Sequence, residues 1–261
     1  MKAILMGKHK RSTVGALEHL VRRRVEVVAV VAPPEAGRAD DSQRLDLAAV
    51  GHGLELTTDD ELYARAEAGD LADVDLVLSF LFWKRIRSPL IELGRIGCLN
   101  FHPAPLPDMR GMGGFNVAIL EGFEQWGVSG HFVDEEFDTG DLVRVDRFPI
   151  EPAATALSLD VESQGRLLAL FEDVIDLALA GEELPRTPQG GGRYVTKEEF
   201  EEMRKVPPDE DPETLDRRIR AFWYPPYDGA TIEVAGRTLS VVDRDLLRQV
   251  AAANAAAGLL P

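Results

Sequence analysis

Short apolar runs alternate with helix-like segments through the first part of the chain. Four of the runs are almost continuously apolar and rich in branched aliphatic residues, namely residues 2–6, 25–33, 74–82 and 96–101. Such runs are typical of strands buried on both faces of a parallel sheet. Amphipathic helices are expected between them, over residues 13–24, 42–53, 59–68 and 89–95. The alternation predicts an α/β fold: a Rossmann-like, mostly parallel sheet with helices on both faces.

Two local details add to this pattern. Ser12 and Thr13 stand at the start of the first helical segment, and each hydroxyl is a candidate N-cap. Residues 54–58, LELTT, predict a further short strand.

The middle of the chain has a different order of elements. A helix is predicted over residues 114–122, and two strands around an acidic loop over residues 127–150. A long amphipathic helix follows over residues 156–181.

The last part of the chain changes in composition. Proline, glycine and charged residues become frequent, which is typical of a segment that crosses a surface, and a helical piece lies within it at residues 196–205. A helix and a pair of strands that turns at Ala235-Gly236 then indicate a small α+β module. We therefore expect one large domain over residues 1–182, and a linker with a small C-terminal domain over residues 183–261.

Composition limits the classes of function. The 261 residues carry a formal net charge of -16, which disfavours nucleic acid as a partner because basic residues supply most of the affinity for phosphates. Cys98 is the only cysteine, so no internal disulfide is possible, which fits the reducing cytoplasm. The first residues lack the apolar core of a signal peptide, and no run of about 18 apolar residues occurs. We expect a cytoplasmic protein that does not enter a membrane.

Polar side chains interrupt the pattern at two points where a strand meets a loop. Asn100 and His102 lie two residues apart at the end of an apolar run, so both project from the same face of the strand. This is the carboxyl end of a predicted parallel strand, and ligands bind at that edge of open α/β sheets. Asp138, followed by Thr139-Gly140, predicts a tight turn that presents a carboxylate. The alternative is structural: Asn100 and His102 cap a strand, and the Asp-x-Gly turn only shapes a loop.

The two motifs together resemble the signature of a known family. NFHPAPLPDMRG, from Asn100, and GVSGHFVDEEFDTGD, from Gly127, are similar to segments of the folate-dependent formyltransferases. This superfamily includes methionyl-tRNA formyltransferases and sugar N-formyltransferases. The resemblance covers roughly residues 1–180, with a further similarity at IRAFWYPPYDGA, residues 219–230. It implies that residues 1–182 are the formyltransferase catalytic domain.

The resemblance implies a reaction and roles for three residues. The formyl donor would be 10-formyltetrahydrofolate, as a co-substrate, and the acceptor a primary amine. Asn100 would donate a hydrogen bond to the oxygen on which negative charge develops. His102 would stabilise the same charge if protonated, or move the amine proton. Asp138 would hold the ring of His102 and raise its pKa. No metal is implied, and the sequence offers no cluster of His and Cys ligands.

Further residues are assigned to the formyl donor. The family's pterin-binding loop corresponds to Phe80, Leu81, Phe82 and Trp83, and Glu135 is assigned to the same ligand; the alternative for the aromatic run is plain core.

The acceptor contacts are assigned to Arg110, Lys8 and Lys10. The basic loop that holds the two lysines is equally typical of an ordinary solvated loop. His131 either lines the site or is a satisfied strand histidine, and Cys98 is interpreted as a small buried apolar residue.

Several acceptors and activities stay open. A nucleotide-linked amino sugar is favoured by the size of the C-terminal module and its similarity to the sugar-modifying branch. Methionyl-tRNA is disfavoured by the net charge of -16, and an amino acid or another small metabolite amine is a further candidate. Hydrolysis of formyltetrahydrofolate and a non-catalytic binding module are alternatives from other classes, the second being weakened by the intact Asn100, His102 and Asp138. A homodimer is also open.

Overall fold

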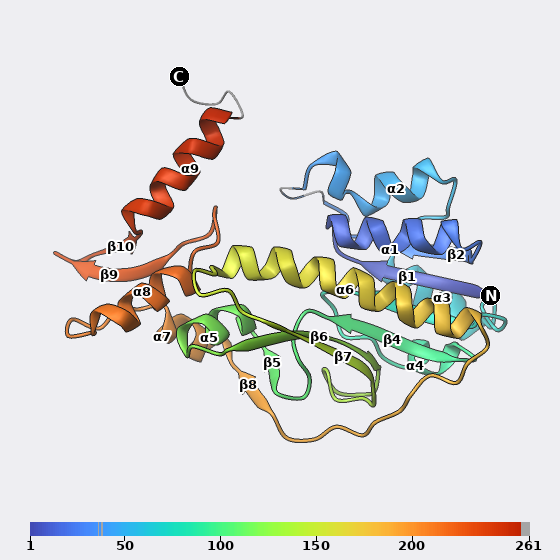
Figure 1. Cartoon of the computed structure of the whole chain (residues 1–261). Coiled ribbons are helices and arrows are strands. Elements are labelled where there is room, and N and C mark those ends of the chain that lie inside the picture. The colour runs from blue at the N-terminus through green and yellow to red at the C-terminus, as the bar shows by residue number, and fades with distance from the viewer. Residues whose placement is uncertain (36, 38, 257–261) are drawn as a thin grey trace. The chain divides into compact units, whose positions relative to one another are not determined.

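A six-stranded sheet in the order β2-β1-β3-β4-β6-β7 organises the part of the protein that holds both motifs (Figure 1). The strands are β1 (Lys2–Gly7), β2 (Glu26–Val31), β3 (Leu76–Phe80), β4 (Gly97–His102), β6 (Gln125–Phe132) and β7 (Leu142–Pro149). The first four run parallel to one another, and β6 runs antiparallel to β4. The predicted Rossmann-like, mostly parallel sheet is confirmed.

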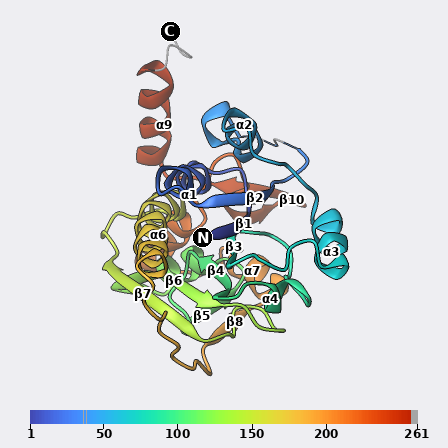
Figure 2. The ribbon, with the colours of Figure 1, turned by 90° about the vertical axis from the view of Figure 1, so that its right-hand side faces the viewer.

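Helices cover both faces of this sheet, as predicted (Figure 2). On one face lie α1 (Arg11–Arg22) and the long α6 (Ala156–Leu179). The ring of Phe171 in α6 packs on those of Phe80 and Phe101, with centroid distances of 5.5 and 4.8 Å. These contacts fix α6 against the middle of the sheet.

The opposite face is covered by α3 (Asp59–Ala68) and the short α4 (Leu90–Leu93). Leu62 and Leu90 of these helices belong to a buried cluster that also contains Cys98. Burial raises the pKa of the Cys98 thiol. Cys98 therefore serves as a small apolar residue of the core, in agreement with its interpretation from the sequence.

Helix boundaries follow the capping chemistry in one case and depart from it in another. Thr58 accepts a hydrogen bond from the backbone N–H of Glu61, and the Glu61 side chain accepts one from Thr58, which forms a capping box at the start of α3. Helix α1 instead begins at Arg11 and has no side-chain cap. The prediction that Ser12 or Thr13 caps α1 is therefore wrong: both side chains are buried inside the first turn, and Ser12 donates to Gln164 of α6.

The region between β2 and α3 also differs from its prediction. The expected helix is divided into a 3-10 turn (Asp41–Gln43) and α2 (Leu45–Gly51). The expected strand over residues 54–58 is reduced to one bridge between Leu56 and Val30, because this segment continues directly into the N-cap of α3.

The structure, a computed structural model, describes residues 1–35, 37 and 39–256. These fall into two compact units: the first is made of described residues within 1–110, 127–148 and 162–193, and the second of residues 111–126, 149–161 and 194–256. Each unit thus draws on three stretches of the chain, whereas the predicted division after residue 182 is a single cut. The compact units are groups of residues in space, whereas the predicted domains are divided along the sequence.

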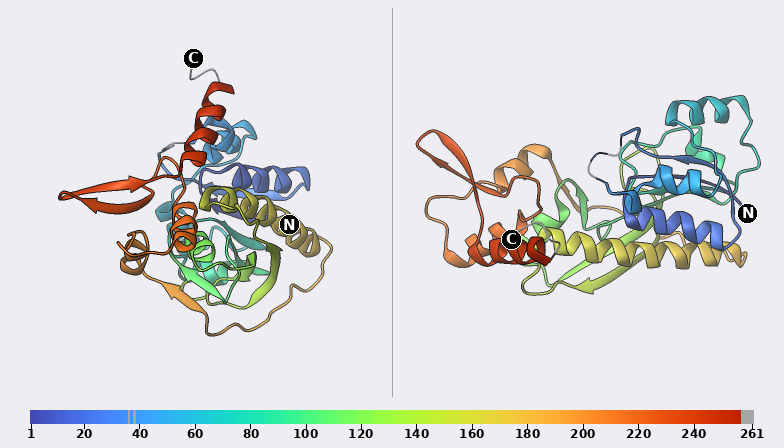
Figure 3. Two further views of the ribbon diagram at one scale, coloured as in Figure 1. Left: turned by 60° about the vertical axis from the view of Figure 1, so that its left-hand side comes forward. Right: turned by 90° about the horizontal axis from the view of Figure 1, so that it is seen from above.

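The second unit contains helices and a hairpin. Its elements are α5 (Gly114–Leu120), α7 (Lys197–Met203), α8 (Pro212–Ala221), the hairpin of β9 (Ala230–Val234) and β10 (Arg237–Val241), and α9 (Arg244–Ala256) (Figure 3). Asn116 of α5 donates to the carbonyl of Ala221 in α8 at 2.6 Å. Two further short strands, β5 (Met109–Gly111) and β8 (Arg193–Val195), pair with each other.

The hairpin turns where the sequence predicts it, at Ala235 and Gly236, whose φ angles of 51° and 73° match a type I′ turn. None of the described helices is long and apolar enough to span a membrane.

The loop between β6 and β7 supplies a stability test. A Cβ at Gly140 would lie 2.1 Å from the carbonyl oxygen of Phe132, whereas one at Gly165, in α6, would meet nothing within 4 Å. We expect Gly140→Ala to lower the free energy of unfolding by about 1–3 kcal/mol because backbone must shift. Gly165→Ala should raise it by up to about 1 kcal/mol through helix propensity. Urea unfolding at constant slope measures both, and a neutral Gly140→Ala would contradict this account of the loop.

Candidate active site

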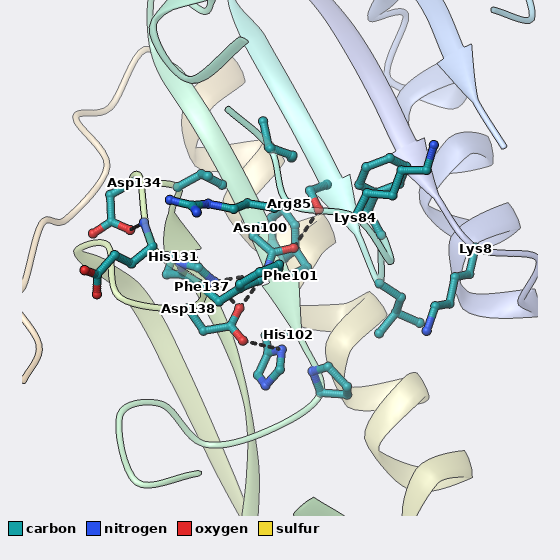
Figure 4. A pocket seen from close by; sticks show the side chains of 17 residues that line it. Lys8, Lys84, Arg85, Asn100, Phe101, His102, His131, Asp134, Phe137 and Asp138 are labelled. Atoms are coloured by element: carbon teal, nitrogen blue, oxygen red, sulfur yellow. Dashed lines mark hydrogen bonds and ion pairs between the residues drawn. The ribbon is translucent and has the colours of Figure 1, made fainter. Parts of the chain in front are cut away.

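Neighbouring strands bring three polar side chains into one row at the carboxyl edge of the sheet. Ser79 of β3 is the register partner of Asn100 in β4, and Asn100 is in turn the partner of His131 in β6. Side chains at the same register position lie on the same face of a sheet. All three line a pocket of about 240 Å³ (Figure 4).

Asn100 and His102 project into this pocket together, as their spacing predicts. Asp138 reaches the same pocket from the loop between β6 and β7. Its Oδ1 accepts a hydrogen bond from Asn100 Nδ2 at 3.3 Å, and its Oδ2 lies 3.7 Å from Nδ1 of His102. The carboxylate therefore stands between the amide and the imidazole.

Asn100 is held on two further sides. The hydroxyl of Ser79 donates to Asn100 Oδ1 at 2.7 Å, and Asn100 Nδ2 lies 3.0 Å from Nε2 of His131. Nδ1 of His131 contacts the backbone carbonyl of Phe132 at 2.6 Å. His131 is thus a pocket residue and a fully hydrogen-bonded strand histidine at once, so the two interpretations of its sequence position are not exclusive.

The electrostatics of the pocket favour an ionised carboxylate beside a neutral imidazole. Burial by itself would raise the pKa of Asp138, but His102, His131 and Arg110 oppose it and bring that pKa down to about 2. Burial lowers the pKa of His102, and it outweighs the opposite effect of Asp138. Asp138 raises the pKa of His102, as expected, but desolvation of the imidazole is the larger influence, so the net shift is downward.

Backbone strain occurs at two residues of the pocket. Leu81 and Asp138 have φ angles of 57° and 56°, a left-handed conformation that costs free energy for a residue with a side chain. The loop around Asp138 is braced by Asp134, which accepts hydrogen bonds from the Thr139 hydroxyl at 2.6 Å and from the Glu136 N–H at 3.1 Å. These bonds fix the turn that presents Asp138.

The residues assigned to the folate loop separate in the structure. Leu81 and Phe82 line the pocket. Phe80 is fully buried in the core, because its position in β3 points it to the α6 face. Trp83 is partly exposed and packs on Phe82 at a centroid distance of 4.6 Å, outside the pocket lining. Glu135 also lies outside the lining and pairs with Arg85 at 3.8 Å.

The residues assigned to the acceptor separate as well. Lys8 lines the pocket, while Lys10 is the residue before α1 and does not. Arg110 donates to the carbonyl of Gly191 at 2.6 Å and lies outside the lining. Its Nε is buried with no hydrogen-bond partner among the described residues.

Sequence reasoning missed several residues of the pocket, among them Ser79, Lys84, Arg85, Asp134 and Phe137. Ser79 could have been found from the pairing of adjacent parallel strands, since it is the one polar residue at the end of the apolar run before Phe80. The others depend on loop conformations that carry no periodic signal.

The arrangement supplies an amide donor, a neutral imidazole and an ionised carboxylate around one cavity. These groups can stabilise a developing oxyanion and move a proton. Within the described part of the chain, no group of three or more His, Cys, Asp or Glu side chains is placed to hold a metal ion.

Known proteins are similar to this chain in sequence and in fold. The GDP-perosamine N-formyltransferase of Brucella melitensis is 29% identical over 70% of this chain and 70% of its own length. The methionyl-tRNA formyltransferase of Parvibaculum lavamentivorans is 31% identical over 92% of this chain and 79% of its own. An N-formyltransferase structure from Helicobacter canadensis, in complex with folinic acid and dTDP-3-aminofucose, shares the fold with a TM-score of 0.75, at 20% identity over 90% of this chain and 85% of that one.

The family model of the formyl transferases matches residues 19–166, more than half of the chain, and this stretch includes Asn100, His102 and Asp138. The protein therefore belongs to the formyl transferase family.

Proposed function

We propose that the protein transfers the formyl group of 10-formyltetrahydrofolate to the primary amine of a nucleotide-linked amino sugar. The observation that carries this proposal is the placement of Asn100, His102 and Asp138 in one pocket, with the Asp138 carboxylate 3.3 Å from the Asn100 amide nitrogen and 3.7 Å from the His102 ring.

Each of the three side chains has a role in this transfer. When the amine nitrogen bonds to the formyl carbon, negative charge develops on the formyl oxygen, and Asn100 Nδ2 donates a hydrogen bond to it, an interaction worth about 3–4 kcal/mol in other enzymes. Neutral His102 takes the proton that the amine nitrogen loses. The same proton then passes to the folate nitrogen as its bond to the formyl carbon breaks, so His102 ends the cycle neutral.

Asp138 makes His102 a better base. Its carboxylate faces Nδ1 of His102, which favours a hydrogen on that nitrogen and leaves the lone pair on Nε2. The negative charge also stabilises the imidazolium that forms when His102 takes the proton. A pKa of about 2 keeps Asp138 ionised throughout the physiological range.

The donor is supported by the apolar side of the pocket. Leu81 and Phe82 offer the apolar surface that a pterin ring requires, and Trp83 packs behind Phe82. The Helicobacter canadensis protein with the same fold is described in complex with folinic acid, a formylated folate.

The acceptor is supported by the basic residues and by relatives. Lys8 at the pocket, with Lys10 and Arg110 as further candidates, offers the few positive charges that a diphosphate needs. The Brucella relative is a GDP-perosamine N-formyltransferase, and the Helicobacter structure holds dTDP-3-aminofucose. The similarity to a methionyl-tRNA formyltransferase makes tRNA the second candidate, but a net charge of -16 opposes a long polyanion.

The assay that tests this function uses 10-formyltetrahydrofolate with a panel of nucleotide-linked amino sugars, and follows product mass. We expect at least one sugar to gain a formyl group in place of an amine hydrogen. Initiator methionyl-tRNA and an amine-free reaction run in parallel. Efficient formylation of tRNA with every sugar inert would overturn the acceptor, and formate release without an amine would indicate a hydrolase instead.

The catalytic roles predict large losses on substitution. His102→Ala and Asp138→Ala should each lower turnover by at least about 100-fold, as expected for groups that act in the transition state. His52→Ala, at an exposed histidine after α2, is the control and should leave turnover unchanged. Near-normal turnover in either site variant, with an unchanged circular dichroism spectrum, would refute the assignment.

The pH profile tests the protonation state of His102. Its folded pKa lies below the ordinary value of 6.5, so the neutral base is present at pH 7 and is lost only as pH falls through the lowered pKa. The acid limb of kcat/KM should therefore lie below pH 6.5. Asp138→Asn removes the charge that raises this pKa, so the limb of its residual activity should move to still lower pH. A shift toward higher pH would contradict the proposed pairing.

A further inference from the structure

Ser79, Asn100 and His131 form a row across three neighbouring strands of the pocket, and their contacts fix the orientation of the Asn100 amide. Ser79 and His131 are 3% and 2% exposed, so neither can exchange its partner in the row for bulk water. Both contact Asn100, from β3 on one side and from β6 on the other. Their contacts go to opposite ends of the same amide group.

The backbone selects one tautomer of His131. A carbonyl oxygen can only accept, so the 2.6 Å contact between Nδ1 and the Phe132 carbonyl requires the ring hydrogen on Nδ1. Nε2 faces Asn100 Nδ2, a donor that the Asp138 carboxylate holds in place, so Nε2 carries the lone pair. That lone pair accepts a hydrogen from Asn100 Nδ2 at 3.0 Å.

Only one orientation of the Asn100 amide satisfies these neighbours. Its nitrogen faces two acceptors, His131 Nε2 and the ionised Asp138 Oδ1, which lie 3.5 Å apart, and it gives one hydrogen to each. Its oxygen accepts from the Ser79 hydroxyl at 2.7 Å. A flipped amide would set its oxygen against the Asp138 carboxylate, whereas the Ser79 hydroxyl can donate or accept and fits either orientation.

Both amide hydrogens of Asn100 are therefore committed in the ligand-free site. The bond to Asp138, at 3.3 Å, is the longest of the three that hold the amide. A ligand oxygen can accept this same hydrogen beside the Asp138 oxygen, while the contacts to Ser79 and His131 keep the amide in place.

We propose that Ser79 and His131, with its ring hydrogen on Nδ1 and its lone pair on Nε2, are positioning residues that hold the Asn100 amide for donation to the formyl oxygen. The effect on catalysis rests on the proposed function, whereas the arrangement of Ser79, Asn100 and His131 does not depend on it. Because the two residues act through Asn100 in the transition state, their loss should lower kcat and leave the KM of both substrates nearly unchanged.

The test compares paired variants. Ser79→Ala removes the donor to Asn100 and should lower kcat about ten-fold, while Ser79→Thr keeps a hydroxyl and should recover most of the loss. His131→Asn is too short to reach Asn100 and should also lower kcat about ten-fold, whereas His131→Gln places a carbonyl acceptor near the Nε2 position and should recover part of it. Cys98→Ala is the control for a small buried truncation, because Cys98 is buried and lies on β4, the strand of Asn100. Its kcat should not change.

A second readout is independent of catalysis. Nitrogen NMR of the ligand-free protein labelled in histidine should show His131 with a hydrogen on Nδ1 and none on Nε2. A hydrogen on Nε2 would overturn the proposal whether or not the protein proves to be active.

The outcomes separate the two proposals. An unsubstituted protein that transfers no formyl group to any amine would refute the proposed function, and the tautomer would still decide the present inference. An active protein in which Ser79→Ala and His131→Asn keep kcat within about two-fold, or raise KM instead, would overturn the positioning role alone.

Discussion

An ionised carboxylate held away from water is the constraint on which the rest of this site depends. Burial disfavours the charged form of Asp138, and the surrounding groups must offset that cost. They do so through a hydrogen bond from Asn100 and through the proximity of His102, His131 and Arg110. Asn100 and His102, which act in the proposed chemistry, are therefore also groups that keep Asp138 charged.

The Asp138 carboxylate is presented on a strained turn, which its surroundings must hold in place. Asp138 adopts a left-handed φ of 56°, a conformation that aspartate tolerates better than most residues. The turn is fixed by hydrogen bonds to Asp134, itself a pocket residue, and by the tight approach of Gly140 to the Phe132 carbonyl. The same Phe132 carbonyl accepts from His131. One peptide group thus joins the loop that carries the acid to the row that orients the amide.

Features of the fold and the site that depend on interactions between residues close in sequence could be predicted, whereas those that depend on long-range contacts could not. The strands and the pairing of Asn100 with His102 are set by local periodicity, which a single chain displays directly. Phe80 shows the limit: its apolar run is visible, but the burial of this ring against α6 depends on tertiary packing that the run does not display. The net pKa of His102 was likewise out of reach, because desolvation depends on all that packs around the ring. The cap at α1 failed for a related reason, since Ser12 is used by the long-range contact to Gln164.

Electrostatics at longer range bear on the choice between acceptors. The pocket gathers Lys8, Lys84 and Arg85 in a chain whose net charge is -16. Interactions between exposed charges are largely screened beyond about 8 Å at physiological ionic strength, so a small anion in the pocket responds mainly to these nearby cations. A polyanion extends over many such lengths and meets the acidic surface as well. Lys84 and Arg85 are themselves opposed by Asp59 and Glu135, which leaves a modest positive field suited to a ligand with few charges. The same distribution of charge that suits the proposed nucleotide-linked sugar therefore weakens the attraction of a nucleic acid.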